Sequence, residues 1–100
     1  MDILKVYIAG KITGENPDIA EQSFLAKEKE LSERGYATFN PYSYGNSQGT
    51  ESTTWHEYMK MLIPKLCECD AICLLHNWEQ SAGAREEARI AQMLNLKFIK

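Results

Sequence analysis

Long hydrophobic runs and an excess of basic residues are both missing from this 100-residue chain. No apolar run approaches the roughly 18–20 residues of a membrane span, so we expect neither a transmembrane helix nor a membrane partner. The first residues, MDILKVYIAGK, lack a basic segment before a long apolar stretch, so we expect no signal peptide. Lys and Arg total 11 against 14 Asp and Glu, a net charge of -3. This balance argues against binding a nucleic-acid polymer, which needs clustered basic side chains.

Cysteine is scarce, being confined to Cys67, Cys69 and Cys73. An odd count without a signal peptide points to the reducing cytoplasm rather than to a disulfide framework. A closed zinc site needs four ligands, and the nearby imidazole of His76 lies at the far end of the same expected strand. We therefore expect small buried residues at a helix-to-strand junction. Without a ligand cluster or a dinucleotide fingerprint, we expect no metal and no other cofactor.

What is present is an ordinary globular composition, with 44% hydrophobic and 25% charged residues. The length fits one domain, residues 1–100. Asn16-Pro17 is a typical helix start, Gly35 a typical helix end, and TWHE at 54–57 matches a capping box. We expect a kink at Pro64. The predicted strands are 5–9, 36–40, 70–75 and 97–99, the predicted helices are 17–34, 54–66 and 81–95, and 41–53 is a predicted polar loop.

This alternation of strands and helices predicts a doubly wound α/β fold of the flavodoxin or Rossmann type. We expect a four-stranded parallel sheet in the order 2-1-3-4 with helices on both faces. Ligands in such folds bind beyond the carboxyl ends of the strands, near the switch in strand order. That switch lies between the first and third strands, so the loops 10–16 and 76–83 are where we expect the chemistry.

The loop after the first strand holds Gly10, Lys11, Ile12, Thr13 and Gly14. Its glycines let the backbone approach a ligand, and its lysine and threonine offer donors to an anion. The spacing matches neither a dinucleotide fingerprint nor a P-loop. The alternative is a plain strand-to-helix turn.

Ser81 and Gly83 open the last predicted helix. A serine cap followed by small residues leaves backbone amides open to an anion, which the helix dipole favours. Simple helix capping is the alternative. Just before them, Trp78 is a candidate pocket wall, or an ordinary packing residue.

Glu87 is the most informative residue, because helical spacing places it among Ala84, Ala88 and Ala91 on an apolar arc. A carboxylate on a buried stripe is costly unless it is paired, and in a pocket it can act as a nucleophile or as an acid or base. The alternative is a partly exposed glutamate favoured by the helix dipole. Tyr7, in the first strand, has a hydroxyl that can reach a carboxylate above the sheet; the alternative is a core tyrosine.

Three stretches together resemble a known group of enzymes: VYIAG at 6–10, CDAI at 69–72, and S-x-G-x-x-x-E-x-x-x-A at 81–91, with Trp78 between the last two. They are similar to the nucleoside 2-deoxyribosyltransferases, and closer to their relatives the 2'-deoxynucleoside 5'-monophosphate N-glycosidases. The resemblance spans nearly the whole chain. It implies an enzyme that transfers deoxyribose between bases, or hydrolyses the N-glycosidic bond, of a small-molecule nucleoside or nucleotide.

The resemblance also implies residue roles. Glu87 would be the nucleophile at C1' of the deoxyribose, and Tyr7 would position it or hydrogen-bond to it. Residues 10–14 would line the sugar or phosphate pocket. Ser81, with Gly83 beside it, would favour a 5'-phosphorylated ligand.

Two departures from the family pattern bear on activity. Leu62 stands where relatives often carry an aspartate that serves as a candidate acid or base for the leaving group. The chain also stops at its fourth strand, whereas larger relatives have a fifth and complete the pocket from a neighbouring subunit; a homo-oligomer is therefore expected. A nucleotide-binding protein without turnover is the first alternative to the enzyme, and a scaffold on the same fold is the second.

Overall fold

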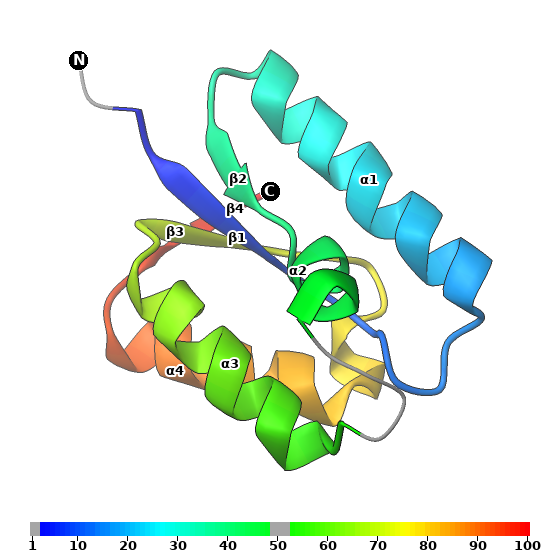
Figure 1. The fold of residues 1–100 in the computed structure, drawn as a ribbon. Helices are drawn as coiled ribbons and strands as arrows, with labels where there is room; N and C mark the ends of the chain where they lie inside the picture. The colour runs from blue at the N-terminus through cyan, green and yellow to red at the C-terminus, as the bar shows by residue number, and fades with distance from the viewer. Residues whose placement is uncertain (1–2, 49–52) are drawn as a thin grey trace.

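The computed structural model describes residues 3–48 and 53–100. Its four strands form one parallel sheet in the order β2-β1-β3-β4, which confirms the predicted topology (Figure 1). In the middle of the sheet Tyr7 is in register with Phe39 on one side and Ile72 on the other. The strands are β1 (Lys5–Ala9), β2 (Ala37–Phe39), β3 (Ala71–Leu74) and β4 (Lys97–Ile99).

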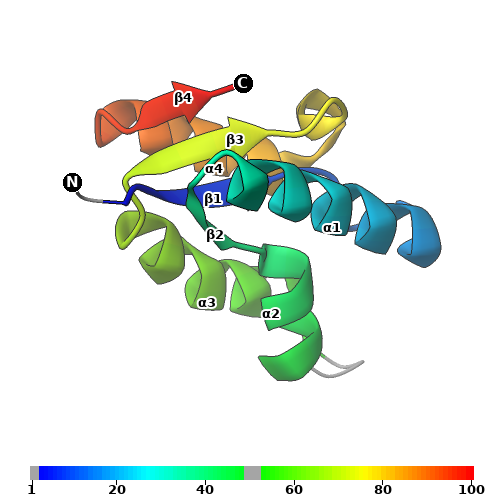
Figure 2. The same ribbon diagram turned by 90° about the horizontal axis from the view of Figure 1, so that it is seen from above.

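Helices cover both faces of this sheet. The helix α1 (Pro17–Glu33) lies on one face, whereas α3 (Trp55–Cys67) and α4 (Ala82–Met93) lie on the other (Figures 1 and 2). Alternate residues of each strand point to opposite faces. Val6 and Ile8 therefore pack with Phe24 of α1, while Tyr7 packs with Leu66 of α3. The two resulting cores are buried and fix the central strands between the helices.

One further helix, α2 (Pro41–Gln48), occupies residues for which the sequence predicts a loop. The side chain of Asn40 caps it by accepting hydrogen bonds from the backbone amides of Tyr42 and Ser43, at 3.0 and 3.2 Å. The loop prediction was therefore wrong for this segment. Of the remaining part of the predicted loop, 49–52 lie outside the described residues and Thr53 is in neither a helix nor a strand. The helix follows β2 and lies between α1 and α3 (Figure 1).

Smaller differences concern the segments around β3. The helix α3 continues through Pro64 to Cys67. Cys69 and Cys73 are buried as expected, but Cys67, the last residue of α3, is exposed. All three thiols are free. The strand β3 ends at Leu74, and Trp78 begins a short 3-10 helix, η1 (Trp78–Gln80).

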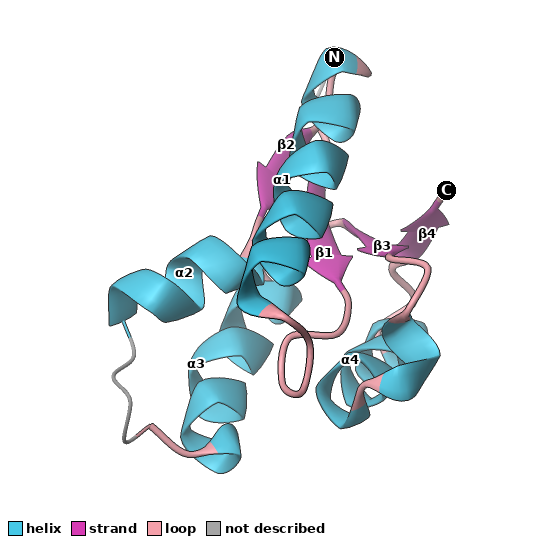
Figure 3. Cartoon of the chain, turned by 90° about the vertical axis from the view of Figure 1, so that its right-hand side faces the viewer, coloured by secondary structure: helices cyan, strands magenta, loops and turns pink. Residues whose placement is uncertain are grey.

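The topology brings the predicted functional loops to one end of the molecule. In Figure 3, β1 points toward the region between α3 and α4, and α2 lies beside α3. No helix within residues 3–48 and 53–100 combines the length and the apolar character that crossing a bilayer requires.

Candidate functional site

The centre of the site is a buried contact between Glu87 and Tyr7. The Tyr7 hydroxyl donates a hydrogen bond to the Glu87 carboxylate. Tyr7 has no exposed surface and Glu87 is only 4% exposed. The Tyr7 ring also stacks on Phe39 of the neighbouring strand, with 5.3 Å between ring centroids. The tyrosine is therefore held by the sheet, and it in turn holds the carboxylate.

Helix periodicity explains why Glu87 faces inward. Ala84, Ala88 and Ala91 are buried on the same side of α4, and residues three and four apart share a helix face. The neighbouring Glu86 instead forms an ion pair with Arg89 at 2.8 Å on the outer side. The predicted position of Glu87 on the buried arc is thus confirmed.

Burial changes the acidity of both groups. Removal from water disfavours the charged form and raises the pKa of Glu87 from 4.5 to about 7, while the hydrogen bond from Tyr7 opposes that rise. Burial, followed by the negative charge of Glu87, raises the pKa of Tyr7 well above 10.0. Near neutral pH, Glu87 therefore exchanges between its protonated and charged forms while Tyr7 keeps its proton.

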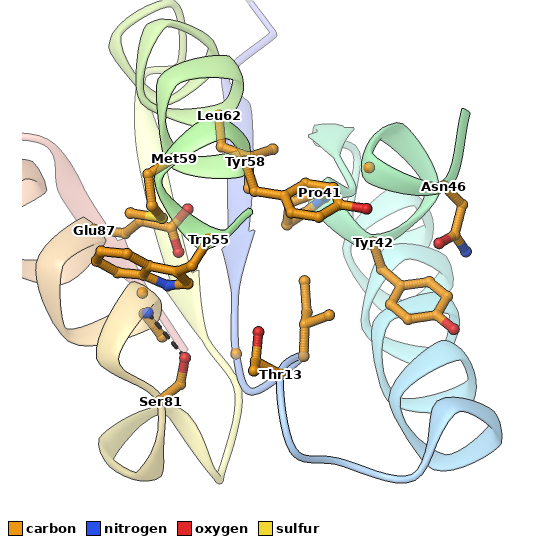
Figure 4. A pocket seen from close by; sticks show the side chains of 15 residues that line it. Thr13, Pro41, Tyr42, Asn46, Trp55, Tyr58, Met59, Leu62, Ser81 and Glu87 are labelled. Atoms are coloured by element: carbon orange, nitrogen blue, oxygen red, sulfur yellow. Dashed lines mark hydrogen bonds between the residues drawn. The ribbon is translucent and has the colours of Figure 1, made fainter. Parts of the chain in front are cut away.

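A cavity of about 140 Å³ lies beside Glu87, whose side chain lines it (Figure 4), whereas Tyr7 is not part of the lining. Within the described part of the chain, Glu87 is the only carboxylate in its lining, and no lysine or arginine joins it. The lining combines apolar, aromatic and small polar side chains from four segments: Gly10, Ile12, Thr13, Pro41, Tyr42, Gly45, Asn46, Trp55, Tyr58, Met59, Leu62, Ser81, Gly83, Ala84 and Glu87.

The loop after β1 contributes three of its five predicted residues to this lining: Gly10, Ile12 and Thr13. An added Cβ at Gly10 would lie 2.5 Å from Leu75 Cδ1, so a side chain there does not fit. Lys11 and Gly14 are not in the lining. The Lys11 amide donates to Asn77 Oδ1 at 3.1 Å, and Gly14 adopts a left-handed turn, with φ of 82°, before α1.

The start of α4 forms another part of the wall. Ser81 Oγ accepts a hydrogen bond from the Ala84 amide at 3.1 Å, so the predicted cap is present. The Cβ position of Gly83 lies 3.4 Å from Trp55 Nε1 and from Met59 Sδ, which shows how closely α3 approaches α4. Trp78, by contrast, is not in the lining and packs with the core residues on the α3 and α4 side of the sheet.

Sequence reasoning did not predict that a helix forms the next part of the wall, which consists of Pro41, Tyr42, Gly45 and Asn46 of α2. A signal was available, because Asn40-Pro41 repeats the Asn16-Pro17 pair that caps α1. Sequence reasoning also did not assign Trp55, Tyr58 and Met59 of α3 to the site, since helical spacing alone does not reveal whether a face meets a cavity. Leu62 was singled out only through the family resemblance.

Sequence reasoning also did not single out Asn77. It is 6% exposed. Its Oδ1 accepts from the Lys11 amide, and its Nδ2 donates to Glu15 Oε2 at 3.3 Å. Asn77 therefore ties the segment after β3 to the loop that carries Ile12 and Thr13.

No group of three or more histidine, cysteine, aspartate or glutamate side chains arranged for a metal occurs among residues 3–48 and 53–100. The cavity lining itself offers two kinds of group that can act chemically on a bound molecule, the Glu87 carboxylate and several hydroxyls. A carboxylate of this kind can attack an electrophilic carbon or transfer a proton.

Comparison with known proteins places this arrangement in a family. A family model described as "Domain of unknown function (DUF4406)" matches residues 4–100. No curated protein matches the chain. The family match covers the whole sheet and every residue that lines the cavity. The chain therefore belongs to the DUF4406 family, a domain of unknown function.

Proposed function

We propose that the protein breaks the N-glycosidic bond of a 2'-deoxynucleoside or its 5'-monophosphate, with Glu87 as the nucleophile. The observation that carries this proposal is the buried Glu87–Tyr7 hydrogen bond at the wall of a cavity beyond the carboxyl ends of β1 and β3. The resemblance to nucleoside 2-deoxyribosyltransferase-like proteins supports the same assignment.

The first step forms a covalent intermediate. The charged Glu87 carboxylate attacks C1', a new C1'–O bond forms, and the bond electrons of C1'–N leave with the base. This is the course of retaining glycosidases. Tyr7 keeps the attacking oxygen in place through its hydrogen bond. Either water or a second base then attacks C1', which returns the carboxylate and gives hydrolysis or transfer.

The two ends of the cavity suit different parts of this substrate. Ser81 and Gly83 lie at the N-terminal end of α4, where backbone amides and the helix dipole favour an anion. Thr13, from the loop after β1, lies on the same side of the cavity as Ser81 (Figure 4). We assign the 5' side of the sugar, with or without its phosphate, to this end. The apolar and aromatic side chains of α2 and α3, Tyr58 and Leu62 among them, suit the flat base.

A second candidate function is binding of the same nucleotide without turnover. Leu62 favours it, because this apolar side chain lines the cavity where the family resemblance expects an aspartate. A protein of this kind would hold a nucleotide and release it unchanged.

Two broader features belong to the same proposal. Three free thiols support a reducing, cytoplasmic location. The expected homo-oligomer would add residues from a second copy of the chain to the open side of the cavity.

Chromatography of free base tests the proposal. The protein is incubated with the four 2'-deoxynucleosides and their 5'-monophosphates, with Glu87→Gln and Glu86→Gln in parallel. We expect release by the wild type and by Glu86→Gln, whose carboxylate is on the outer face, but not by Glu87→Gln. Tight binding without release would favour the second function, and neither binding nor release would exclude both.

A further inference from the structure

Breaking an N-glycosidic bond leaves negative charge on the base unless a proton is supplied. Retaining glycosidases use a second carboxyl group for this purpose. Among the described residues of the cavity lining, Glu87 is the only carboxylate, and it is committed to C1'. We infer that Tyr58 is the proton donor to the departing base, an inference that rests on the proposed function.

Tyr58 occupies the required side of the cavity. It lies one helical turn before Leu62 on α3, and both side chains line the cavity. In Figure 4 its ring extends toward α2, with the hydroxyl on the side away from the Glu87 carboxylate. A displacement at C1' places the attacking group and the leaving group on opposite sides of the carbon. A donor to the base must therefore lie opposite Glu87, as Tyr58 does.

The ring of Tyr58 lies next to Gly45 of α2. The Cβ position of Gly45 lies 3.3 Å from Tyr58 Cε1, so the absence of a side chain at Gly45 leaves room for the ring. The hydroxyl has no hydrogen-bond partner within residues 3–48 and 53–100, and it is thus available to a ligand.

The other hydroxyls of the lining are engaged or lie elsewhere. Tyr42 donates its hydroxyl hydrogen to the carbonyl oxygen of Pro17 at 3.2 Å. Ser81 caps α4, and Thr13 lies on the same side of the cavity as Ser81 (Figure 4). Tyr58 is therefore the hydroxyl positioned toward the base.

Tyr58 gives its proton to the base in the first step and recovers a proton in the second. A Glu87 oxygen bonds to C1' while the C1'–N electron pair passes to the base, and the base nitrogen or oxygen takes the proton of the Tyr58 hydroxyl. In hydrolysis, water then bonds to C1' through its oxygen, the C1'–O bond to Glu87 breaks, and the water proton returns to the Tyr58 oxygen. In transfer, the incoming base gives up the same proton.

Substrates with different leaving groups test this role. Adenine must be protonated as it leaves 2'-deoxyadenosine, whereas 7-methylguanine leaves 7-methyl-2'-deoxyguanosine as a neutral molecule without a proton. We expect Tyr58→Phe to lower kcat/KM for 2'-deoxyadenosine by about 100-fold. For 7-methyl-2'-deoxyguanosine, corrected for release without enzyme, we expect a change of less than about threefold. Tyr36→Phe, the same substitution outside the lining, should change neither value.

An equal loss for both substrates in Tyr58→Phe would overturn the inference, because it would indicate a role in binding or folding. Unchanged kinetics for both would overturn it as well. These outcomes differ from a failure of the proposed function, in which the wild type would release base from neither substrate, and the inference would fall with it.

Discussion

The hydroxyl of Tyr7 and the carboxylate of Glu87 are hydrogen-bonded although 80 residues separate them in the chain. Tyr7 comes from the central strand β1, and Glu87 comes from α4, which packs on the same face of the sheet. The contact joins the one carboxylate of the described cavity lining to the most buried part of the fold. The charge of this carboxylate should therefore affect both stability and activity.

Replacing Glu87 by Gln should remove the part of the pH dependence of folding stability that comes from this carboxylate. The pKa of Glu87 is 4.5 ordinarily and about 7 when folded, so the unfolded chain releases this proton first. The contribution of Glu87 to the free energy of unfolding is therefore fully present below its unfolded pKa of 4.5, and it is lost as the pH rises through its folded pKa of about 7. The shift corresponds to a loss of about 3 kcal/mol, complete just above neutral pH.

Urea unfolding of the wild type and the variant at pH 4.5 and pH 8 measures this loss. We expect the wild type to lose more stability than Glu87→Gln between the two pH values, whatever their absolute stabilities. Glu86→Gln, which removes an exposed carboxylate of the same helix, serves as the control and should behave as the wild type. The same pH dependence in Glu87→Gln would contradict the burial of a titrating Glu87.

Removing the Tyr7 hydroxyl should raise the pKa of Glu87 further. The hydrogen bond from Tyr7 favours the charged carboxylate and lowers that pKa. In Tyr7→Phe we therefore expect a pKa above 7, read from the side-chain carboxyl resonance of labelled glutamate, and an activity profile shifted to higher pH. A pKa that stays the same or falls would show that the hydroxyl does not stabilise the carboxylate.

Asn77 should control the order of the loop after β1. Truncation to Ala leaves the Lys11 amide without its acceptor, which costs about 1–3 kcal/mol for a buried group. We expect faster hydrogen exchange at that amide and a higher KM, because the loop carries Ile12 and Thr13 into the cavity. Glu15→Gln keeps an acceptor for Asn77 Nδ2 and should alter both values much less. Unchanged exchange in Asn77→Ala would rule out this positioning role.

A side chain at Gly10 should destabilise the fold. The added Cβ of Gly10→Ala would lie 2.5 Å from Leu75 Cδ1 and 2.9 Å from Leu75 Cβ, and overpacking of this kind costs about 1–3 kcal/mol. A double-mutant cycle with Leu75→Ala separates the two contacts. We expect favourable coupling that recovers part of the cost, because Leu75→Ala removes the clashes with Cδ1 and Cγ and leaves the one with Cβ; additive losses would argue against a direct contact.

Sequence reasoning reached the sheet order and the buried carboxylate because both follow from repeating patterns. Alternating strands and helices leave few parallel arrangements, and helical spacing places Glu87 within the apolar arc of the last helix. The pairing with Tyr7 was available only as a possibility, since the hydroxyl and the carboxylate meet through the packing of α4 on β1.

The cavity wall formed by α2 and α3 could not be predicted from the sequence, for a different reason. Residues 41–48 are mostly polar and include a glycine, a composition that favours a loop. The hydrogen bond by which Asn40 caps α2 forms only when the helix is present. Tyr58 and Leu62 share a helix face, but spacing cannot say whether such a face meets another element or a cavity. That depends on where Gly45 leaves space for the tyrosine ring.

The most direct test of the account is mass spectrometry of the protein quenched in acid during turnover of a 2'-deoxynucleoside. A nucleophilic Glu87 should appear as a peptide that carries one 2-deoxyribosyl group on Glu87, absent before substrate is added and absent in Glu87→Gln. Release of base with Glu87 unmodified, or with the sugar on another residue, would contradict the central claim.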